Sequence, residues 1–485
     1  MDKGKNMARE ELDTVAIEPL SPVSQLLSSP ETFIVITFGS KTRLNLSSFV
    51  EGLNNTLINA PRFCCKMDTD YKKNGEPVWI PVSVRVEDHV IVPDLEYHNI
   101  DNPDQFVEDY TSNLANIPMD MSKPLWEFHF LDIKTSNAES IAIAKIHHSI
   151  GDGMSLVSLL VACARKTSEP SALTSTTTAT AKHVTSMSSA RWLFSGFLLM
   201  MMAIFSTIVD VFKTLLTILF LRDTKNPLMA NPNNGIRSWK VIHQTISFDD
   251  VKLVKNTMNM TVNDVLLGMT QAGLSRYLSR NYDGYTMSEK KKTLEKIRVR
   301  GSVPVNLRPA TKIEDLADMM AKGSKCRWGN LVAVVLFPLW IKVEDDPLEY
   351  IRRAKTIMDR KKISLEAFIL YGIIKFTSTL FGNKGVQEIG ARIFGHTTMT
   401  ISNVKGPQEE ISLFGHPVSY VAGSAFIGQQ ALIINFISYI DKIVINLAVD
   451  TTTISDPHLL CDDLVDSLKI IKSAVREKGF HNGVI

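Results

Sequence analysis

Two adjacent histidines followed by a glycine-rich loop are the residues of this 485-residue chain best suited to chemistry. An apolar run leads into the segment His147, His148, Ser149, Ile150, Gly151, Asp152, Gly153. Imidazole takes a proton from a hydroxyl near neutral pH when its tautomer is fixed. We predict that His148 is a general base and that Asp152 holds the loop by a buried ion pair or hydrogen bonds. Gly151 and Gly153 would allow a tight path or positive φ.

The spacing leaves a structural alternative open, in which Asp152 only caps a helix beginning near Met154. The strand preceding the histidines constrains the choice, because successive strand residues face opposite sides. If His148 points into a substrate channel, His147 faces the domain core and braces the loop by hydrogen bonds. Adjacent histidines on opposite faces do not readily ligate one ion, so we predict no metal site. No Gly-x-Ser-x-Gly elbow is present, which disfavours a serine nucleophile.

The composition excludes some classes of protein. Fifty-three basic and 51 acidic residues leave a net charge of +2, so nothing indicates nucleic-acid binding. The five cysteines are odd in number and lack metal-ligand spacing, and residues 1–14 lack the apolar core of a signal peptide. We therefore expect free cytosolic thiols at Cys64, Cys65, Cys163, Cys326 and Cys461.

Two polar pairs in the second half are further candidates for substrate or oxyanion contact. Asn263 and Asp264 open a helix whose free N–H groups would suit an oxyanion, although Thr261 and Asp264 also form a capping-box pattern. Ser402 and Asn403 follow a polar strand and precede Gly-Pro, which predicts a turn. A purely structural role is the stronger expectation for both pairs.

Hydrophobic periodicity predicts the elements that position these residues. Residues 125–131 and 141–146 read as an antiparallel pair whose second strand ends at the histidines. Further strands are expected at 33–38, 82–86, 397–401, 432–439 and 443–449, and helices at 46–55, 154–166, 251–256 and 457–477. Residues 366–380 read as a core helix, or alternatively as an amphipathic helix that lines a channel or faces a membrane.

The ordered set of motifs resembles the wax ester synthase/diacylglycerol acyltransferase family, above all its plant members. His-His-x-x-x-Asp-Gly at 147–153 is similar to the family signature. Other blocks resemble later family motifs in the same order: Pro124-Leu125-Trp126-Glu127, Asn263-Asp264, Val303-Pro304-Val305-Asn306-Leu307-Arg308, Trp328-Gly329-Asn330 and Ser402-Asn403-Val404-Lys405-Gly406-Pro407. The likeness runs from about Glu18 to the last helix.

The resemblance implies an α/β (α+β) fold of two chloramphenicol-acetyltransferase-like sandwich domains with mixed sheets and a substrate tunnel at their interface. It implies that His148 deprotonates a fatty alcohol or diacylglycerol, which attacks acyl-CoA without an acyl-enzyme, and that no cofactor is needed. It also implies contact with membrane lipids at the cytosolic face of the endoplasmic reticulum, with the plasma membrane as an alternative. The preferred acceptor, chain length, protein partners and oligomeric state stay open.

The chain divides into an N-terminal domain (1–166), a Ser/Thr-rich linker (167–190), a hydrophobic segment (191–222) and a C-terminal domain (223–485). The hydrophobic segment is long enough to span a bilayer, although Asp210 and Lys213 argue against a simple span unless they pair. One crossing would also separate the two halves of the site that the resemblance implies. We favour a re-entrant hairpin or interfacial helix over a single span or a helix buried between domains.

Two other classes of function stay open. A soluble CoA-dependent acyltransferase would use the same His148 and Asp152 on another alcohol, but would lack the hydrophobic segment. A non-catalytic lipid-binding protein would keep that segment and lose the base, which is intact here.

Overall fold

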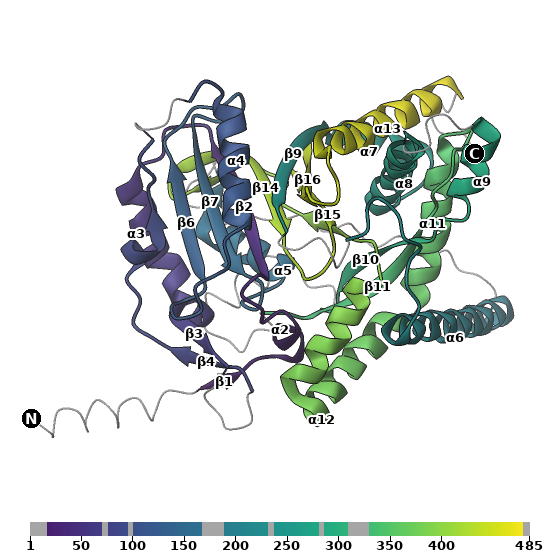
Figure 1. Ribbon diagram of the computed structural model, residues 1–485, viewed down its shortest axis with the longest axis horizontal. Helices are drawn as coiled ribbons and strands as arrows, with labels where there is room; N and C mark the ends of the chain where they lie inside the picture. Colours follow the sequence, from purple (N-terminus) through teal and green to yellow (C-terminus); the bar gives the residue numbers. More distant parts are fainter. Residues whose placement is uncertain are drawn as a thin grey trace, which may run out of the picture.

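Two mixed sheets covered by helices form two halves that lie side by side (Figure 1). The computed structural model describes residues 17–69, 76–95, 100–166, 189–230, 237–280, 286–308 and 329–478. Cys326, Trp328 and the predicted linker up to residue 188 lie outside the described residues. The predicted pair of α/β sandwiches is confirmed by the two sheets.

The sheet of the first half carries the histidine motif. Its strand order is β5 (Val90–Ile91), β6 (Trp126–Leu131), β7 (Ser140–His147), β2 (Phe33–Ser40), β14 (His416–Ala425), β13 (Ile411–Leu413) and β8 (Ala164–Lys166). β7 pairs antiparallel with both β6 and β2, which confirms the predicted pair ending at the histidines. Every residue of β7 is buried, as expected for a strand covered on both faces.

The second half has a six-stranded sheet and contributes strands to the first. The order is β11 (Val332–Leu339), β10 (Val299–Asn306), β12 (Met399–Lys405), β15 (Leu432–Tyr439), β16 (Lys442–Asp450) and β9 (Trp239–Ser247). β12 runs parallel to β10 and β15, whereas the other pairs are antiparallel. β13 and β14 join the first sheet although they belong to the predicted C-terminal domain, an exchange that the domain boundaries did not anticipate.

Helices pack against the sheets and around them (Figure 1). They are α2 (Pro22–Leu26), α3 (Leu46–Thr56), α4 (Pro103–Ala115), α5 (Gly153–Cys163), α6 (Ser189–Leu219), α7 (Phe248–Thr257), α8 (Val262–Arg280), α9 (Met287–Leu294), α11 (Leu348–Ile363), α12 (Glu366–Gly395) and α13 (Pro457–Glu477). Short 3-10 turns are η1 (Leu57–Asn59), η2 (Pro61–Cys64) and η3 (Val86–His89). A small sheet joins β1 (Glu18–Pro19), β4 (Val78–Pro81) and β3 (Cys65–Asp68).

Three predicted elements differ from the structure. Residues 82–86 alternate in exposure without a strand partner, because an extended segment can bury one side without ladder bonds. The helix expected over 154–166 ends at Cys163, since Ala164–Lys166 pairs with β13 of the other half. Ser402 to Lys405 continue β12 beside β15 instead of turning, and the strand ends at Lys405, just before Gly406.

The hydrophobic segment forms one continuous helix, α6, so the re-entrant hairpin prediction is wrong. Among the described residues, Gly196–Leu219 is the single helical stretch that by itself is long and apolar enough to cross a bilayer, with a mean hydropathy of 1.8. The pair α11 and α12, bent by 56°, passes the same test only together. Just 22% of the α6 stretch is buried, which excludes the helix buried between domains.

Candidate active site

His148 lies at the end of β7, in a cavity between the two halves. Its side chain is 8% exposed and lines a cavity of about 220 Å³. Two backbone contacts fix its position: its N–H donates to the Thr32 carbonyl (3.0 Å), and its carbonyl accepts from Asn330 Nδ2 (2.7 Å). Thr32 belongs to the first half and Asn330 to the second, so both halves hold the predicted base.

His147 points the opposite way, into the protein. Its Nε2 lies 2.9 Å from the Ser29 carbonyl oxygen, which can only accept, so Nε2 carries the proton. Nδ1 accordingly accepts from the Ser149 hydroxyl (2.6 Å) and backbone N–H (3.2 Å). Burial lowers the pKa of His147 to about 4. The structure thus places His147 where the sequence predicted it, as a neutral imidazole that braces the loop.

Because the pKa of His147 is lowered, we predict that the protein becomes less stable as the pH decreases. Between pH 6.5 and about 4, the unfolded chain binds a proton that the native His147 refuses, so the free energy of unfolding decreases as the pH falls. The expected contribution is about 1.4 kcal/mol per pH unit in that window. Urea unfolding at pH 7, 6 and 5 gives the free energy of unfolding at each pH. This free energy should depend less on pH in His147→Asn than in the native chain. An equal dependence of the unfolding free energy on pH in both proteins would contradict a neutral, buried His147.

Asp152 joins the histidine loop to the second half. Its carboxylate accepts from the Ser155 N–H (2.9 Å), as the cap of α5, and also from Arg308 Nη1 (2.8 Å) and the Leu331 N–H (2.9 Å). The side chains of Asp152 and Arg308 are each 2% exposed. Asp152 therefore does both things that the sequence offered as alternatives, because it caps the helix and forms a buried ion pair.

Arg308 and Asn330 are residues of the candidate site that the sequence analysis did not single out. Arg308 Nη2 donates to the Ser155 hydroxyl (2.9 Å) and to the Gly329 carbonyl (2.7 Å). Asn330 Nδ2 also reaches the Ser149 carbonyl (3.1 Å). Two motif blocks, 303–308 and 328–330, contained Arg308 and Asn330 and were the available signal. These contacts fasten the loop after β7 across the interface.

Gly153 acts through its small size and not through positive φ. The positive-φ glycines of the described chain do not include Gly151 or Gly153, so that part of the prediction is wrong. Gly153 lies against β12, and a Cβ there would come within 3.2 Å of Val404 Cγ2. Gly153 therefore allows the N-terminus of α5 to approach the second half.

The second-half candidates are only partly brought to the cavity. Ser402 lines it, whereas Asn403 is exposed on the other side of β12 and donates to Asn263 Oδ1. Asp264 is fully buried and accepts from the Thr261 N–H (2.8 Å), while its own N–H donates to Thr261 Oγ1 (3.3 Å). The capping box is therefore present, and neither Asn263 nor Asp264 is a cavity-lining residue.

The cavity wall is mostly aliphatic and aromatic, with a few polar side chains besides His148. These are Asp152, Thr400, Ser402 and Asn435. The apolar residues come from both halves and include Leu26, Ile36, Phe38, Leu156, Val404, Ile374 and Phe394. Such a chamber suits a long hydrocarbon chain next to one proton-transfer group. Within the described ranges, no group of three His, Cys, Asp or Glu side chains has the geometry of a metal site.

Comparisons with known proteins agree with this geometry. The family model for the wax ester synthase/diacylglycerol acyltransferase catalytic domain matches residues 35–266, and the model for the WS/DGAT C-terminal domain matches residues 328–472. Wax ester synthase/diacylglycerol acyltransferase 1 of Arabidopsis thaliana is 70% identical over 99% of both chains, and number 3 of the same plant is 65% identical over 99% of both.

Solved structures share the fold at low identity. The wax ester synthase/diacylglycerol acyltransferase from Marinobacter aquaeolei VT8 matches with a TM-score of 0.58 and 17% identity over 94% of this chain and 100% of that one. The first condensation domain of the calcium-dependent antibiotic synthetase matches with a TM-score of 0.59 and 11% identity over 95% and 97%. The predicted fold is thereby confirmed. The identity with the plant relatives shows that this chain belongs to the wax ester synthase/diacylglycerol acyltransferase family.

Proposed function

We propose that this protein is an O-acyltransferase that moves a long-chain acyl group from acyl-CoA to a fatty alcohol, to diacylglycerol or to both. The proposal rests on the position of His148. Its imidazole lies at the wall of an apolar cavity, and contacts from both halves hold it there. The names of the plant relatives support wax esters and triacylglycerol as products.

The proposed reaction needs one proton acceptor and a dry chamber. His148 takes the proton of the acceptor hydroxyl as its oxygen attacks the thioester carbonyl carbon. The tetrahedral oxyanion then collapses, the carbon–sulfur bond breaks, and the proton passes from His148 to the departing CoA sulfur. The apolar wall excludes water that would otherwise hydrolyse the thioester. No cofactor takes part, and acyl-CoA is a substrate.

Burial at the cavity tunes the base for this reaction. It lowers the pKa of His148 below the ordinary value of 6.5, although the backbone carbonyl of His148, Asp152 and Asn330 oppose the shift. Since the neutral imidazole is the active form, kcat/KM should stay high below pH 6.5 and decline only at a lower midpoint. A pH profile of acyl transfer tests this directly. A midpoint above 6.5 would contradict a base that burial keeps neutral.

The proposed substrates and the apolar surface of α6 support a membrane location for the enzyme. We assign it to the cytosolic face of the endoplasmic reticulum membrane, with plasma membrane as the alternative outcome of a localisation experiment. The exposed apolar side chains of α6 support contact with membrane lipids and disfavour a soluble acyltransferase. The intact base disfavours a non-catalytic lipid-binding protein.

The test is product formation by purified membranes that carry this chain. Labelled palmitoyl-CoA is supplied with hexadecanol in one reaction and diacylglycerol in the other, and membranes without the chain give the background. Ester above background supports the proposal, and the ratio of the two initial rates ranks the acceptors. Background-level product with both acceptors would overturn it for these substrates.

A further inference from the structure

Helix α6 has the reverse polarity of a soluble surface helix. Its buried side chains are mainly polar and recur at helical spacing: Ser206, Thr207, Asp210, Thr214 and Thr217. Its exposed side chains are apolar: Phe197, Leu198, Leu199, Met200, Met201, Met202, Ile204, Phe205, Ile208, Phe212, Leu215 and Leu219. A soluble helix buries its apolar stripe and exposes the polar one. The outer face of α6 therefore suits an apolar solvent.

A first ionic cluster, the Asp210 clamp, fixes the middle of α6 to the junction of α11 and α12. Asp210 is fully buried, and its Oδ1 lies 2.7 Å from Arg360 Nη1 and 3.1 Å from Lys361 Nζ. Lys361 also pairs with Glu366 (2.6 Å), which accepts from the Thr214 hydroxyl (2.6 Å). Lys213 is exposed and Asp210 pairs with Arg360 and Lys361, so the Asp210–Lys213 pairing that the spacing allowed is not formed.

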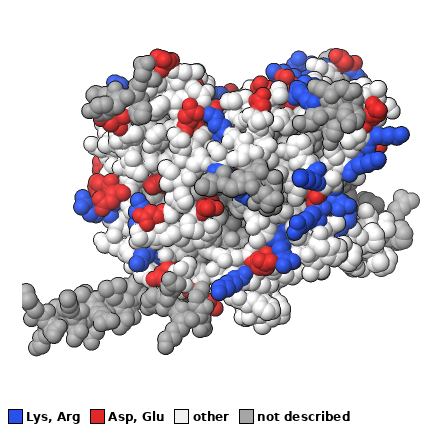
Figure 2. Space-filling view, in the orientation of Figure 1, with Lys and Arg blue, Asp and Glu red and all other residues white. Residues whose placement is uncertain are grey.

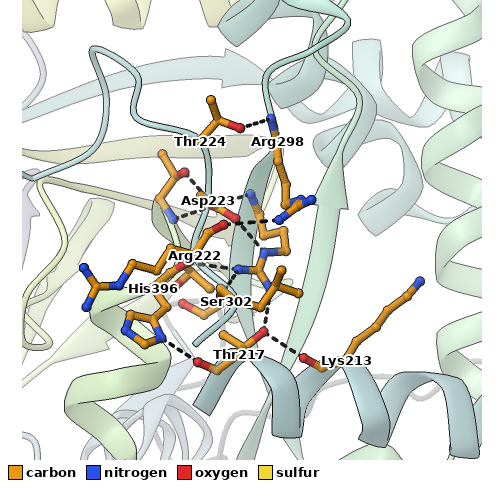
Figure 3. Close-up of polar contacts among 12 residues, drawn as sticks. Lys213, Thr217, Arg222, Asp223, Thr224, Arg298, Ser302 and His396 are labelled. Carbon is orange, nitrogen blue, oxygen red and sulfur yellow. Dashed lines mark hydrogen bonds and ion pairs between the residues drawn. The ribbon is translucent and has the colours of Figure 1, made fainter. Parts of the chain in front are cut away.

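A second cluster, the Arg300 clamp, fixes the C-terminal end of α6 to the second sheet and to the end of α12 (Figure 3). The Arg300 guanidinium donates to the Asp223 carboxylate (2.6 Å), to the Thr217 hydroxyl, and to the Leu221 and His396 carbonyls (2.9 and 3.0 Å). His396 Nδ1 donates in turn to the Thr217 carbonyl. Removing one partner of a buried charged network leaves an uncompensated buried charge, so α6 stays with the catalytic body.

Helix α12 extends the same apolar surface. Its exposed apolar side chains are Phe368, Ile369, Phe376, Leu380 and Phe381, and Leu365 precedes them. Ile374, on the opposite side of the helix from Phe376, lines the His148 cavity. We call the exposed apolar residues of α6 and α12 the α6–α12 surface. Figure 2 shows uncharged atoms at the lower edge, where α12 lies, and at the lower right, where α6 lies.

The charges around the α6–α12 surface favour lipid headgroups. The exposed basic residues on or beside the two helices are Lys213, Arg222, Lys225, Lys375, Lys384 and Arg392. Of the carboxylates within α6 and α12, Asp210 and Glu366 are buried in the Asp210 clamp, and Glu388 pairs with Arg392 (2.6 Å). A cationic rim around apolar side chains matches the phosphates and acyl chains of one leaflet.

A second cavity lies beside the kink of α12 and is lined in part by Asn383. Gly382, at φ +59°, interrupts the helix between Asn383 and Phe381, and of these two neighbours Phe381 is exposed. Asn383 lines a cavity of about 890 Å³, and its buried Oδ1 has no hydrogen-bond partner in the described part of the chain. Three side chains, Leu26, Phe394 and Ile427, line both this cavity and the His148 cavity. The two chambers therefore share a wall next to the membrane-facing helix.

We propose that α6 lies in the plane of one bilayer leaflet and does not cross it, and that lipid alcohols leave that leaflet at the α12 kink, passing Asn383 to reach His148. The bilayer is the partner of the α6–α12 surface. The unpaired Asn383 oxygen accepts the hydroxyl of the incoming alcohol. The inference deepens the proposed function and rests on it.

The surface is tested with Phe376→Ser/Leu380→Ser. With hexadecanol in phosphatidylcholine vesicles, this variant should transfer acyl groups at least tenfold more slowly than the native chain and should bind the vesicles more weakly. With hexadecanol in detergent micelles, both should agree within twofold. The control Ile117→Ser/Met287→Ser removes two exposed apolar side chains elsewhere and should change neither assay. Unchanged transfer from vesicles would overturn the proposal that the α6–α12 surface contacts the bilayer. A native chain that is inactive in both assays would overturn the proposed function.

The route is tested with Asn383→Ala. The KM for hexadecanol in micelles should rise several-fold while the KM for palmitoyl-CoA stays unchanged. If instead the palmitoyl-CoA KM rises, the second cavity serves the donor and the route is wrong.

The in-plane arrangement is tested by labelling from one side of sealed microsomes. Lys41→Cys in the first half and Lys469→Cys in the second are exposed positions on either side of α6 in sequence. A membrane-impermeant maleimide should label both from the cytosolic side. Protection of one of them until detergent is added would show that α6 crosses the bilayer.

Discussion

His148→Ala is expected to lower kcat for ester formation by about 10²–10⁴-fold, the range that a general base contributes. The KM for acyl-CoA should change little, because the lost imidazole acts on the acceptor proton. Its neighbour His147 cannot substitute, since both of its nitrogens are engaged on the far side of the strand. Stopped-time assays with labelled palmitoyl-CoA and hexadecanol measure the loss.

The control for His148→Ala is His243→Gln, which removes a partly buried imidazole. His243 stacks on Tyr420 and lines neither cavity, so this change should leave kcat within a few-fold. Thermal unfolding of both variants separates a catalytic loss from a folding defect. A His148→Ala protein that is folded and retains more than a tenth of native kcat would contradict the assignment of the base.

Local patterns were sufficient to predict the elements around the histidines. The alternation over 125–131 and the apolar run over 141–146 predicted β6 and β7, and the opposite directions of His147 and His148 followed from strand geometry alone. The helix Pro457–Glu477 and the hairpin of β15 and β16 were also predicted, since each carries a strong period and clear boundaries. These features depend on contacts within short stretches of chain.

Contacts between distant segments could not be predicted. Arg308 reaches Asp152 across 156 positions, and no sequence pattern identifies that partner. β13 and β14 leave their own half for the first sheet, which periodicity cannot show. The hydropathy of α6 was evident from the sequence. The partners of its buried polar face, Arg360 and Arg300, could not be predicted because they lie far away in the chain. The sequence therefore predicted the position and direction of the candidate base His148, but not the distant side chains that hold its loop.

Asp152→Asn is expected to be the most destabilising single change in the loop. The substitution keeps the shape of the side chain but removes the charge that Arg308 Nη1 contacts at 2.8 Å, in a place where both side chains are 2% exposed. Breaking a buried ion pair from one side costs about 3–5 kcal/mol, because the remaining charge loses its counterion without regaining water. Urea unfolding should show this loss of unfolding free energy.

The matched control is Glu410→Gln, which breaks the exposed pair with Lys41 that also joins the two halves. An exposed pair is worth at most about 1 kcal/mol. In a double-mutant cycle, Asp152→Asn/Arg308→Met should lose clearly less unfolding free energy than the two single variants lose in sum. The reason is that both charges of the pair are then absent. Additive losses would mean that Asp152 stabilises the loop through the backbone of Ser155 and Leu331 alone.

The same variant separates a positioning role from stability. Because Asp152 lies four residues after His148 and fastens that loop to the second half, its loss should also lower kcat at a temperature where the variant is fully folded. Misplacing a base by about 1 Å can cost about 10²-fold in rate. The pH midpoint set by His148 should move further down, since the Asp152 charge opposes the lowering of the His148 pKa by burial. Native kcat in folded Asp152→Asn would confine Asp152 to stability.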